Sequence, residues 1–195
     1  MWDERYSAKD YIYGTEPNEF LAAQCDLLSG KVLSIGEGEG RNAVFLATRG
    51  IEMQCIDGSK VGLEKAAALA ASKGVQISTM VGDLAEFSPA PESFDGVISI
   101  FAHLPSSIRY RLYPLLIASL KPGGIFLMES YSLDQLGRET GGPKDADMLM
   151  SMDKIRTEFD GLEVVLLQEI ERDVVEGTHH TGMASVVQFI GRKPI

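Results

Sequence analysis

Three glycines at alternate positions, Gly36, Gly38 and Gly40, form the stretch of this sequence best suited to binding a ligand. They follow the apolar run 32–35 and precede a segment, starting at Arg41, with the apolar spacing of a helix. Glycine adopts the positive φ angles of a tight turn and lets a ligand lie against the backbone. Because free amide groups face outward at a helix N-terminus, the pattern predicts a loop that binds a polar or anionic group. A turn that merely joins a strand to a helix gives the same pattern, and this alternative stays open.

The residues after the glycines narrow the class of ligand. A dinucleotide fingerprint, G-x-G-x-x-G, needs a third glycine at the position of Arg41. Asp57 ends the next apolar run about 20 residues further on, where a carboxylate can bind the two hydroxyls of a ribose. These features predict a ligand that contains a nucleoside and disfavour NAD.

The remainder of the chain predicts a scaffold in which strands alternate with helices. We expect strands over 32–35, 52–56, 75–81, 94–101 and 125–130. This alternation is typical of a doubly wound α/β fold with a mostly parallel sheet. Two further runs, about 162–172 and 182–192, have no helix between them and predict an antiparallel C-terminal hairpin.

Polar residues stand at the carboxyl ends of these predicted strands. They are Gly36 with Glu37, Asp57, Asp83, His103 and Glu129. Ligands of doubly wound sheets bind beyond these ends, where the strand order reverses, so we expect the residues to surround one site.

Several segments interrupt the alternation. Pro114 should split the helix that starts near Ser106, because its ring clashes inside a continuous helix. Residues 121–124 predict a turn, and the glycine-rich segment 131–150 predicts a loop on the substrate side. The aromatic residues of segment 1–16 indicate an arm that either packs on the core or forms a lid over the ligand.

Length and composition limit the class of protein. The 195 residues suit a single domain, 1–195, and no apolar run is long enough for a membrane span. A net charge of −10 disfavours nucleic acid as a partner. No signal peptide is recognisable, and Cys25 and Cys55 lie in apolar patterns typical of reduced core thiols. We therefore expect a cytoplasmic protein, a monomer or weak homodimer, that acts on a small molecule.

Three segments carry a family resemblance: 2–6 (WDERY), 13–18 (YGTEPN) and 38–42 (GEGRN). With them the chain resembles the class I S-adenosylmethionine-dependent methyltransferases, which have a Rossmann-like seven-stranded fold ending in a hairpin. It is similar in particular to the small bacterial group related to tellurite-resistance and thiopurine methyltransferases. A cyanobacterial-type branch of that group shares segments 102–107 (AHLPSS) and 141–145 (GGPKD).

The resemblance implies roles for the residues already singled out. Gly36, Gly38 and Gly40 would pass beneath the methionine part of the cofactor, with Arg41 or an arm tyrosine near its carboxylate. Asp57 would bind the ribose. Gly58 and Ser59 would lie beside the adenosine, and Asp83 and Leu84 would contact the adenine. The residues near the transferable methyl group would be Ile100, Phe101 and His103.

The chain departs from the family pattern at two positions. Ser34 stands where the first strand of the family usually carries an acidic residue, and Glu37 stands where a small residue or cysteine is usual. A carboxylate at position 37 is unfavourable for the cofactor carboxylate. We expect it to pair instead with the amino group or the sulfonium charge.

Methyl transfer from a sulfonium is an in-line displacement that mainly requires alignment and exclusion of water. His103 is the candidate base for an acceptor that is protonated at neutral pH, or else it only orients a loop. Tyr13 and Tyr131 are further candidates for site residues. Each is better suited to shaping the pocket than to taking part in the chemistry. A soft acceptor, a thiol or a chalcogen oxyanion, would need little or no base.

Two other functions remain open from the sequence. One is a protein that binds the cofactor or its demethylated product without turnover, and the other is an NAD-dependent oxidoreductase. No metal site is expected, since the adjacent His179 and His180 point apart and have no further ligands at suitable spacing.

Overall fold

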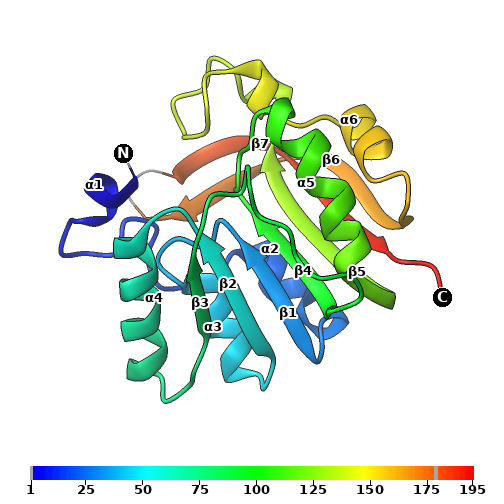
Figure 1. The fold of residues 1–195 in the computed structure, drawn as a ribbon. Helices are drawn as coiled ribbons and strands as arrows, with labels where there is room; N and C mark the ends of the chain where they lie inside the picture. Colours follow the sequence, from blue (N-terminus) through cyan, green and yellow to red (C-terminus); the bar gives the residue numbers. More distant parts are fainter. Residues whose placement is uncertain (1, 178–179) are drawn as a thin grey trace.

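In the computed structural model, which describes residues 2–177 and 180–195, the chain forms a seven-stranded sheet of order β3-β2-β1-β4-β5-β7-β6 (Figure 1). Strands β1 to β5 are parallel, and β7 runs antiparallel to both β5 and β6. The strands are β1 (Lys31–Ile35), β2 (Glu52–Asp57), β3 (Ser78–Val81), β4 (Phe94–Ile100), β5 (Leu120–Tyr131), β6 (Glu163–Glu176) and β7 (His180–Arg192). This confirms the predicted doubly wound fold with an antiparallel C-terminal pair.

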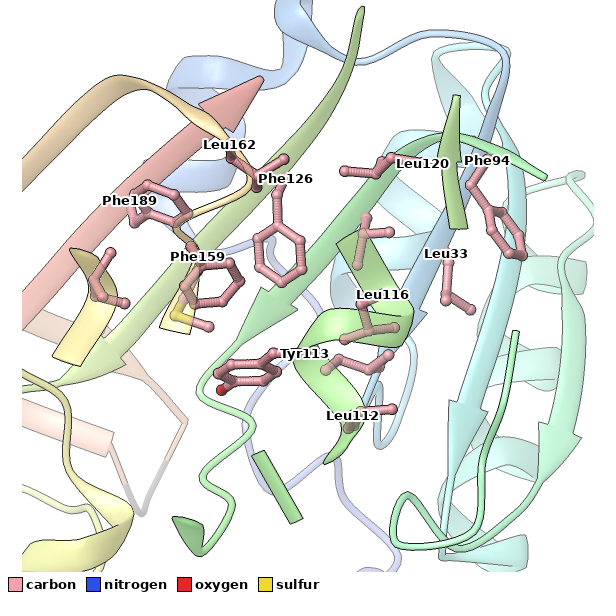
Figure 2. Packing of buried hydrophobic residues seen from close by; sticks show 14 of the residues in the cluster. Leu33, Phe94, Leu112, Tyr113, Leu116, Leu120, Phe126, Phe159, Leu162 and Phe189 are labelled. Atoms are coloured by element: carbon pink, nitrogen blue, oxygen red, sulfur yellow. The ribbon is translucent and has the colours of Figure 1, made fainter. Parts of the chain in front are cut away.

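Helices cover both faces of the sheet. They are α1 (Trp2–Tyr6), α2 (Glu19–Gln24), α3 (Arg41–Thr48), α4 (Lys60–Ser72), α5 (Ser106–Ser119) and α6 (Met152–Glu158). Because side chains alternate along a strand, β1 directs Leu33 into the core under α5 and α6, and Val32 into the core under α2 and α3. Figure 2 shows the first core, in which the rings of Tyr113, Phe126 and Phe159 pack together.

The order of the strands creates the crevice that a ligand needs. Strand β1 pairs with β2 on one side and with β4 on the other, so the chain changes direction along the sheet at this point. The carboxyl ends of these strands lie at the same edge, next to the start of α3. This is the switch point at which doubly wound sheets bind their ligands.

Two local predictions were wrong. Helix α5 runs unbroken through Pro114, which lies on its exposed side, so the Tyr110 carbonyl that loses its helical partner remains near water. Residues 121–124 belong to β5 instead of forming a separate turn, and the pairing with β4 shifts register between Phe94 and Gly96. The extra residues are absorbed as a bulge, with Gly123 at a φ of 79°.

Element boundaries differ from expectation mainly on the N-terminal side of the sheet. Strand β3 begins at Ser78, where the sequence predicted a start at 75, and α2 stops at Gln24 and continues as a short 3-10 turn, Cys25–Leu27. Segment 131–150 contains two further 3-10 turns, Leu133–Gln135 and Ala146–Met148. The turn between β6 and β7 includes residues 178 and 179, which lie outside the described part of the chain.

Candidate functional site

The carboxyl ends of β1, β2 and β4 border a cleft with a volume of about 930 Å³. The N-terminal arm and the segment 141–148 complete its walls. Eleven of the residues predicted for a site line it: Tyr13, Gly36, Glu37, Arg41, Asp57, Gly58, Asp83, Leu84, Ile100, Phe101 and His103.

The two ends of this cleft differ in character. The acidic end consists of Asp57, Gly58, Gly82 and Asp83, which lie at or just after the carboxyl ends of β2 and β3. The aromatic end consists of Phe101, His103, Leu104, Ile108 and Met148, which come from the end of β4, the start of α5 and the 3-10 turn at 146–148. The cleft therefore joins a polar compartment to an apolar one.

The structure places three predicted site residues behind the cleft lining. A side chain at Gly38 would meet the hydroxyl of Tyr6 at 2.7 Å, and one at Gly40 would meet Ala66 at 2.6 Å, so both positions need glycine for packing. The Ser59 hydroxyl accepts a hydrogen bond from Gly62 N at 3.0 Å and caps α4. These residues shape the loop from behind.

Asp57 connects the glycine loop to the end of β2. Its Oδ2 accepts a hydrogen bond from Gly38 N and its Oδ1 accepts one from Ser59 N, both at 2.8 Å. Burial raises the pKa of the Asp57 carboxyl, and the two amide hydrogen bonds oppose that shift. Because each carboxylate oxygen can accept a second hydrogen bond, Asp57 can still bind two hydroxyl groups.

Glu37 and Ser34, the two departures from the family pattern, are bonded to each other. The Ser34 hydroxyl donates to Glu37 Oε2, and Ala43 N in the first turn of α3 donates to Oε1 at 2.9 Å. Burial raises the pKa of Glu37, while these two hydrogen bonds lower it. The carboxylate thus caps α3 from inside the glycine loop at the wall of the cleft.

Arg41 already has an anionic partner. Its Nη2 lies 2.6 Å from Glu176 Oε2, and both side chains are buried. Its Nη1 donates to the carbonyl of Glu16 at 3.4 Å. The charge of Arg41 is therefore balanced before any ligand binds, although a guanidinium has further N–H groups to offer.

Glu129 was expected to border the cleft from its position near the carboxyl end of β5, but it does not line it. It is fully buried, and its carboxylate accepts hydrogen bonds from Asn18, Arg172 and Gln188 at 2.6–2.9 Å. Asn18 also donates to Glu176, so that a buried polar network extends from β5 to Arg41. The role of Glu129 is to hold the arm, α3 and the C-terminal strands together.

Phe101 and His103 form the aromatic wall of the cleft, and the buried ring of Tyr131 packs behind them. The imidazole of His103 stacks on Tyr131 with centroids 5.3 Å apart, and Phe101 lies 4.6 Å from Tyr131. Phe101 has a φ of 50°, an uncommon backbone conformation for a bulky residue and one often found at functional sites. The N–H of Tyr131 donates to His103 Nε2 at 3.3 Å, which requires Nε2 to be unprotonated.

The N-terminal arm both packs on the glycine loop and borders the cleft. Asp3 accepts a hydrogen bond from the Ser59 hydroxyl at 2.5 Å, and Glu39 accepts one from Ile12 N at 2.8 Å. Helix α1 packs beside α4 (Figure 1), and its residue Tyr6 lines the cleft together with Tyr13. The two alternatives considered for the arm are thus compatible.

Some lining residues had no clear signal in the sequence. Ile108 and Met148 carry no motif, whereas Asn42 falls in segment 38–42, and Leu104 and Gly141–Pro143 fall in the segments shared with the cyanobacterial-type branch. The described residues contain no group of three or more His, Cys, Asp or Glu placed to hold a metal, and His179 lies outside them. None of the described helices is long and apolar enough to cross a membrane.

Comparison with known proteins places the glycine loop, the acidic end and most of the aromatic end of the cleft in a known domain. Residues 32–124 match the family model described as a methyltransferase domain. The matched range covers just under half of the chain, and the fold is shared with the solved methyltransferase structures described next. The matched range holds the glycine loop, Asp57, Asp83 and His103, but neither the arm nor segment 131–150. No curated protein matches the sequence significantly.

Solved structures with the same fold cover most of the chain. One of them has 22% identity and a TM-score of 0.78, and the match covers 99% of this chain and 91% of the other. That structure concerns the conversion of a disulfide bond into a thioacetal group during echinomycin biosynthesis. The N-methyltransferase NodS from Bradyrhizobium japonicum has 16% identity, a TM-score of 0.70 and coverage of 98% and 96%. An S-adenosylmethionine-dependent methyltransferase from Mesorhizobium loti has 16% identity, a TM-score of 0.69 and coverage of 89% and 95%.

The residues of the cleft are suited to S-adenosylmethionine, on which the Mesorhizobium loti methyltransferase depends. Gly36 has a φ of 63°, and a Cβ at this position would come within 2.9 Å of Ala102, so both the turn and the packing require glycine where the loop borders the cleft. Asp57 offers unused acceptor capacity at the acidic end.

Proposed function

We propose that the protein transfers the methyl group of S-adenosylmethionine to a small soft nucleophile, a thiol or a chalcogen oxyanion. The observation that supports this best is the aromatic end of the cleft, which adjoins the glycine loop and can hold an acceptor away from water. An organic thiol is the better fit, because the cations that line the cleft, Arg5 and Arg41, already bond Tyr13 and Glu176.

The proposed roles follow from position. The carboxylate of Asp57 binds the ribose hydroxyls, with Gly58 and Ser59 beside it and Asp83 and Leu84 next to the adenine. The glycine loop passes beneath the methionine part, and Ile100 and Phe101 border the transferable methyl. The cofactor supplies an activated methyl carbon when bound, so these residues have only to align the acceptor with it.

The wider assignment is also part of the proposal. The tellurite-resistance and thiopurine methyltransferase-like group remains our proposal for the branch. A sulfur-related neighbour and an N-methyltransferase share the fold, so the fold alone does not choose the acceptor. We propose one domain, 1–195, acting in the cytoplasm as a monomer or weak homodimer, consistent with buried free thiols at Cys25 and Cys55.

Calorimetric titration with S-adenosylhomocysteine, the demethylated product, tests the first half of this proposal, with NADH as the control. We expect micromolar binding of the product and none of NADH. A panel of thiols, selenite and tellurite then tests the second half by product formation. Product binding without turnover on any acceptor would favour a protein that only binds the cofactor, and binding of NADH alone would favour an oxidoreductase.

Replacing Glu37 by glutamine separates its structural role from a role at the cofactor. The pKa of Glu37 is raised in the folded state, so its protonated form stabilises the fold. This contribution is complete below the unfolded-state pKa of 4.5 and is lost as the pH rises through the folded-state pKa. The variant should therefore gain stability relative to the wild type as the pH rises above 4.5, and be at least as stable at pH 7, measured by urea unfolding.

The same variant should bind S-adenosylmethionine about tenfold more weakly, as expected for a lost hydrogen bond or contact to a charged group. A larger loss for S-adenosylmethionine than for the product would indicate pairing with the sulfonium, and equal losses would indicate the amino group. Unchanged affinity for both compounds would remove Glu37 from the cofactor site.

His103→Ala tests whether the imidazole acts as a base. Because Nε2 accepts the Tyr131 N–H, a base at this residue has to act through Nδ1 or break that bond. An alkyl thiol has a pKa of about 8.5 and must lose its proton, so we expect its turnover to fall about 100-fold. An aromatic thiol that is already ionised at pH 7 should be methylated almost normally. Equal rates for the variant and the wild type on both thiols would leave His103 without a proton-transfer role. Tyr13→Phe is the control at the mouth of the cleft.

A further inference from the structure

The aromatic end of the cleft lies on irregular backbone. Leu104 stands between β4 and α5, and Met148 stands in a 3-10 turn, so neither is held by sheet pairing. These two side chains face the same cavity although 44 positions of sequence separate them. Some interaction outside the regular elements must therefore keep the two loops in register.

One buried side chain makes that connection. Arg109 in the first turns of α5 is 1% exposed, and its Nη1 donates to the carbonyl of Leu104 at 2.7 Å and to the carbonyl of Asp147 at 2.6 Å. A single nitrogen thus bonds both loops, at Leu104 and at the residue before Met148.

A second set of contacts holds the guanidinium in place. Glu158 of α6 accepts from Arg109 Nε at 2.9 Å and from Nη2 at 3.0 Å, in the bidentate arrangement that fixes the plane of a guanidinium. Asp147 also accepts from Ser106 N at 2.7 Å and so caps the start of α5. Two guanidinium nitrogens, Nε and Nη2, bond Glu158, and Nη1 is left for the two loops. The single ammonium group of a lysine cannot reproduce this arrangement.

We propose that Arg109 is a positioning residue that sets the shape of the aromatic end by joining residues 104 and 147. The proposal rests on the proposed function in so far as the aromatic end receives the acceptor. Arg109 does not line the cleft and so acts only through the loops that it holds.

The test compares Arg109→Lys with Arg111→Lys. Arg111 lies on the same helix and also donates to two carbonyls, those of Glu86 and Phe87, but away from the aromatic end. For Arg109→Lys we expect at least a tenfold higher KM for an aromatic thiol, a change below threefold in the Kd of S-adenosylhomocysteine, and faster amide exchange over 146–149. Arg111→Lys should change none of the three by more than twofold.

A KM for the thiol that stays within twofold of the wild type would overturn the proposal, as would equal losses in KM and product binding, which indicate general destabilisation. If Arg109→Lys does not fold, Glu158→Gln keeps both carbonyl bonds, and a smaller rise of the thiol KM in the same direction is expected. If the wild type methylates no thiol, the proposed acceptor fails. Amide exchange over 146–149 then decides whether Arg109 positions the loops, and unchanged protection in Arg109→Lys refutes that role.

Discussion

Glu129→Ala is expected to lower the free energy of unfolding by about 3–5 kcal/mol, as when one partner is removed from a buried ion pair. Arg172, whose Nη2 lies 2.6 Å from Glu129, would keep its charge in a buried setting with Glu176 as a more distant partner at 3.6 Å. Asn18 and Gln188 would each lose an acceptor as well. Urea unfolding at pH 7 measures the change.

Glu19→Ala is the matched control, because Glu19 pairs with the same arginine at 3.4 Å but is 75% exposed. A solvated pair of this kind contributes about 0–1 kcal/mol. If the two variants lost equal stability, burial would not be the reason for the effect at Glu129. Since the network ends on Arg41, the Glu129 variant should also bind S-adenosylhomocysteine more weakly.

Asp57→Ala is expected to weaken binding of S-adenosylhomocysteine by about 1–3 kcal/mol, or roughly 5- to 150-fold. The substitution removes the proposed acceptor for the ribose hydroxyls, together with the two amide hydrogen bonds that hold Gly38 and Ser59. Calorimetry at pH 7 gives the affinity, and unfolding in urea shows how much of the loss comes from the loop.

Two further variants separate these contributions. Asp57→Asn retains one acceptor oxygen and should lose less affinity than the alanine variant. Asp95→Ala removes a carboxylate that also accepts from backbone, at Lys31 N, but lies at the opposite end of the sheet. Wild-type affinity in Asp57→Ala would mean that the ribose binds elsewhere, and reduced affinity in Asp95→Ala would mean that any loss of stability weakens binding.

The fold was predictable because its signals are local. Apolar runs of strand length, the glycines that follow β1 and the acidic residue that ends β2 can each be recognised within a few residues of sequence. The convergence of these residues then follows from the geometry of any parallel sheet.

The features that sequence reasoning missed depend on distant partners or on solvent. Pro114 is tolerated inside α5 because it lies on the exposed side, which the residue type does not reveal. The contact of Arg41 with Glu176 spans 135 positions, and no spacing rule indicates it. Glu129 was expected in the cleft because position along a strand predicts the edge of the sheet but not which neighbours take up a carboxylate.

The backbone of Phe101 has a consequence for how variants of this protein would be selected. Its φ of 50° is held by the hydrogen bond from its own N–H to the Glu129 carbonyl at 2.8 Å, and such a conformation costs on the order of 1–3 kcal/mol. Glycine at this position would relieve the strain while removing the ring from the wall. A library screened for heat resistance alone would therefore enrich substitutions that erase the aromatic wall, so thermostability and acceptor selection must be screened together.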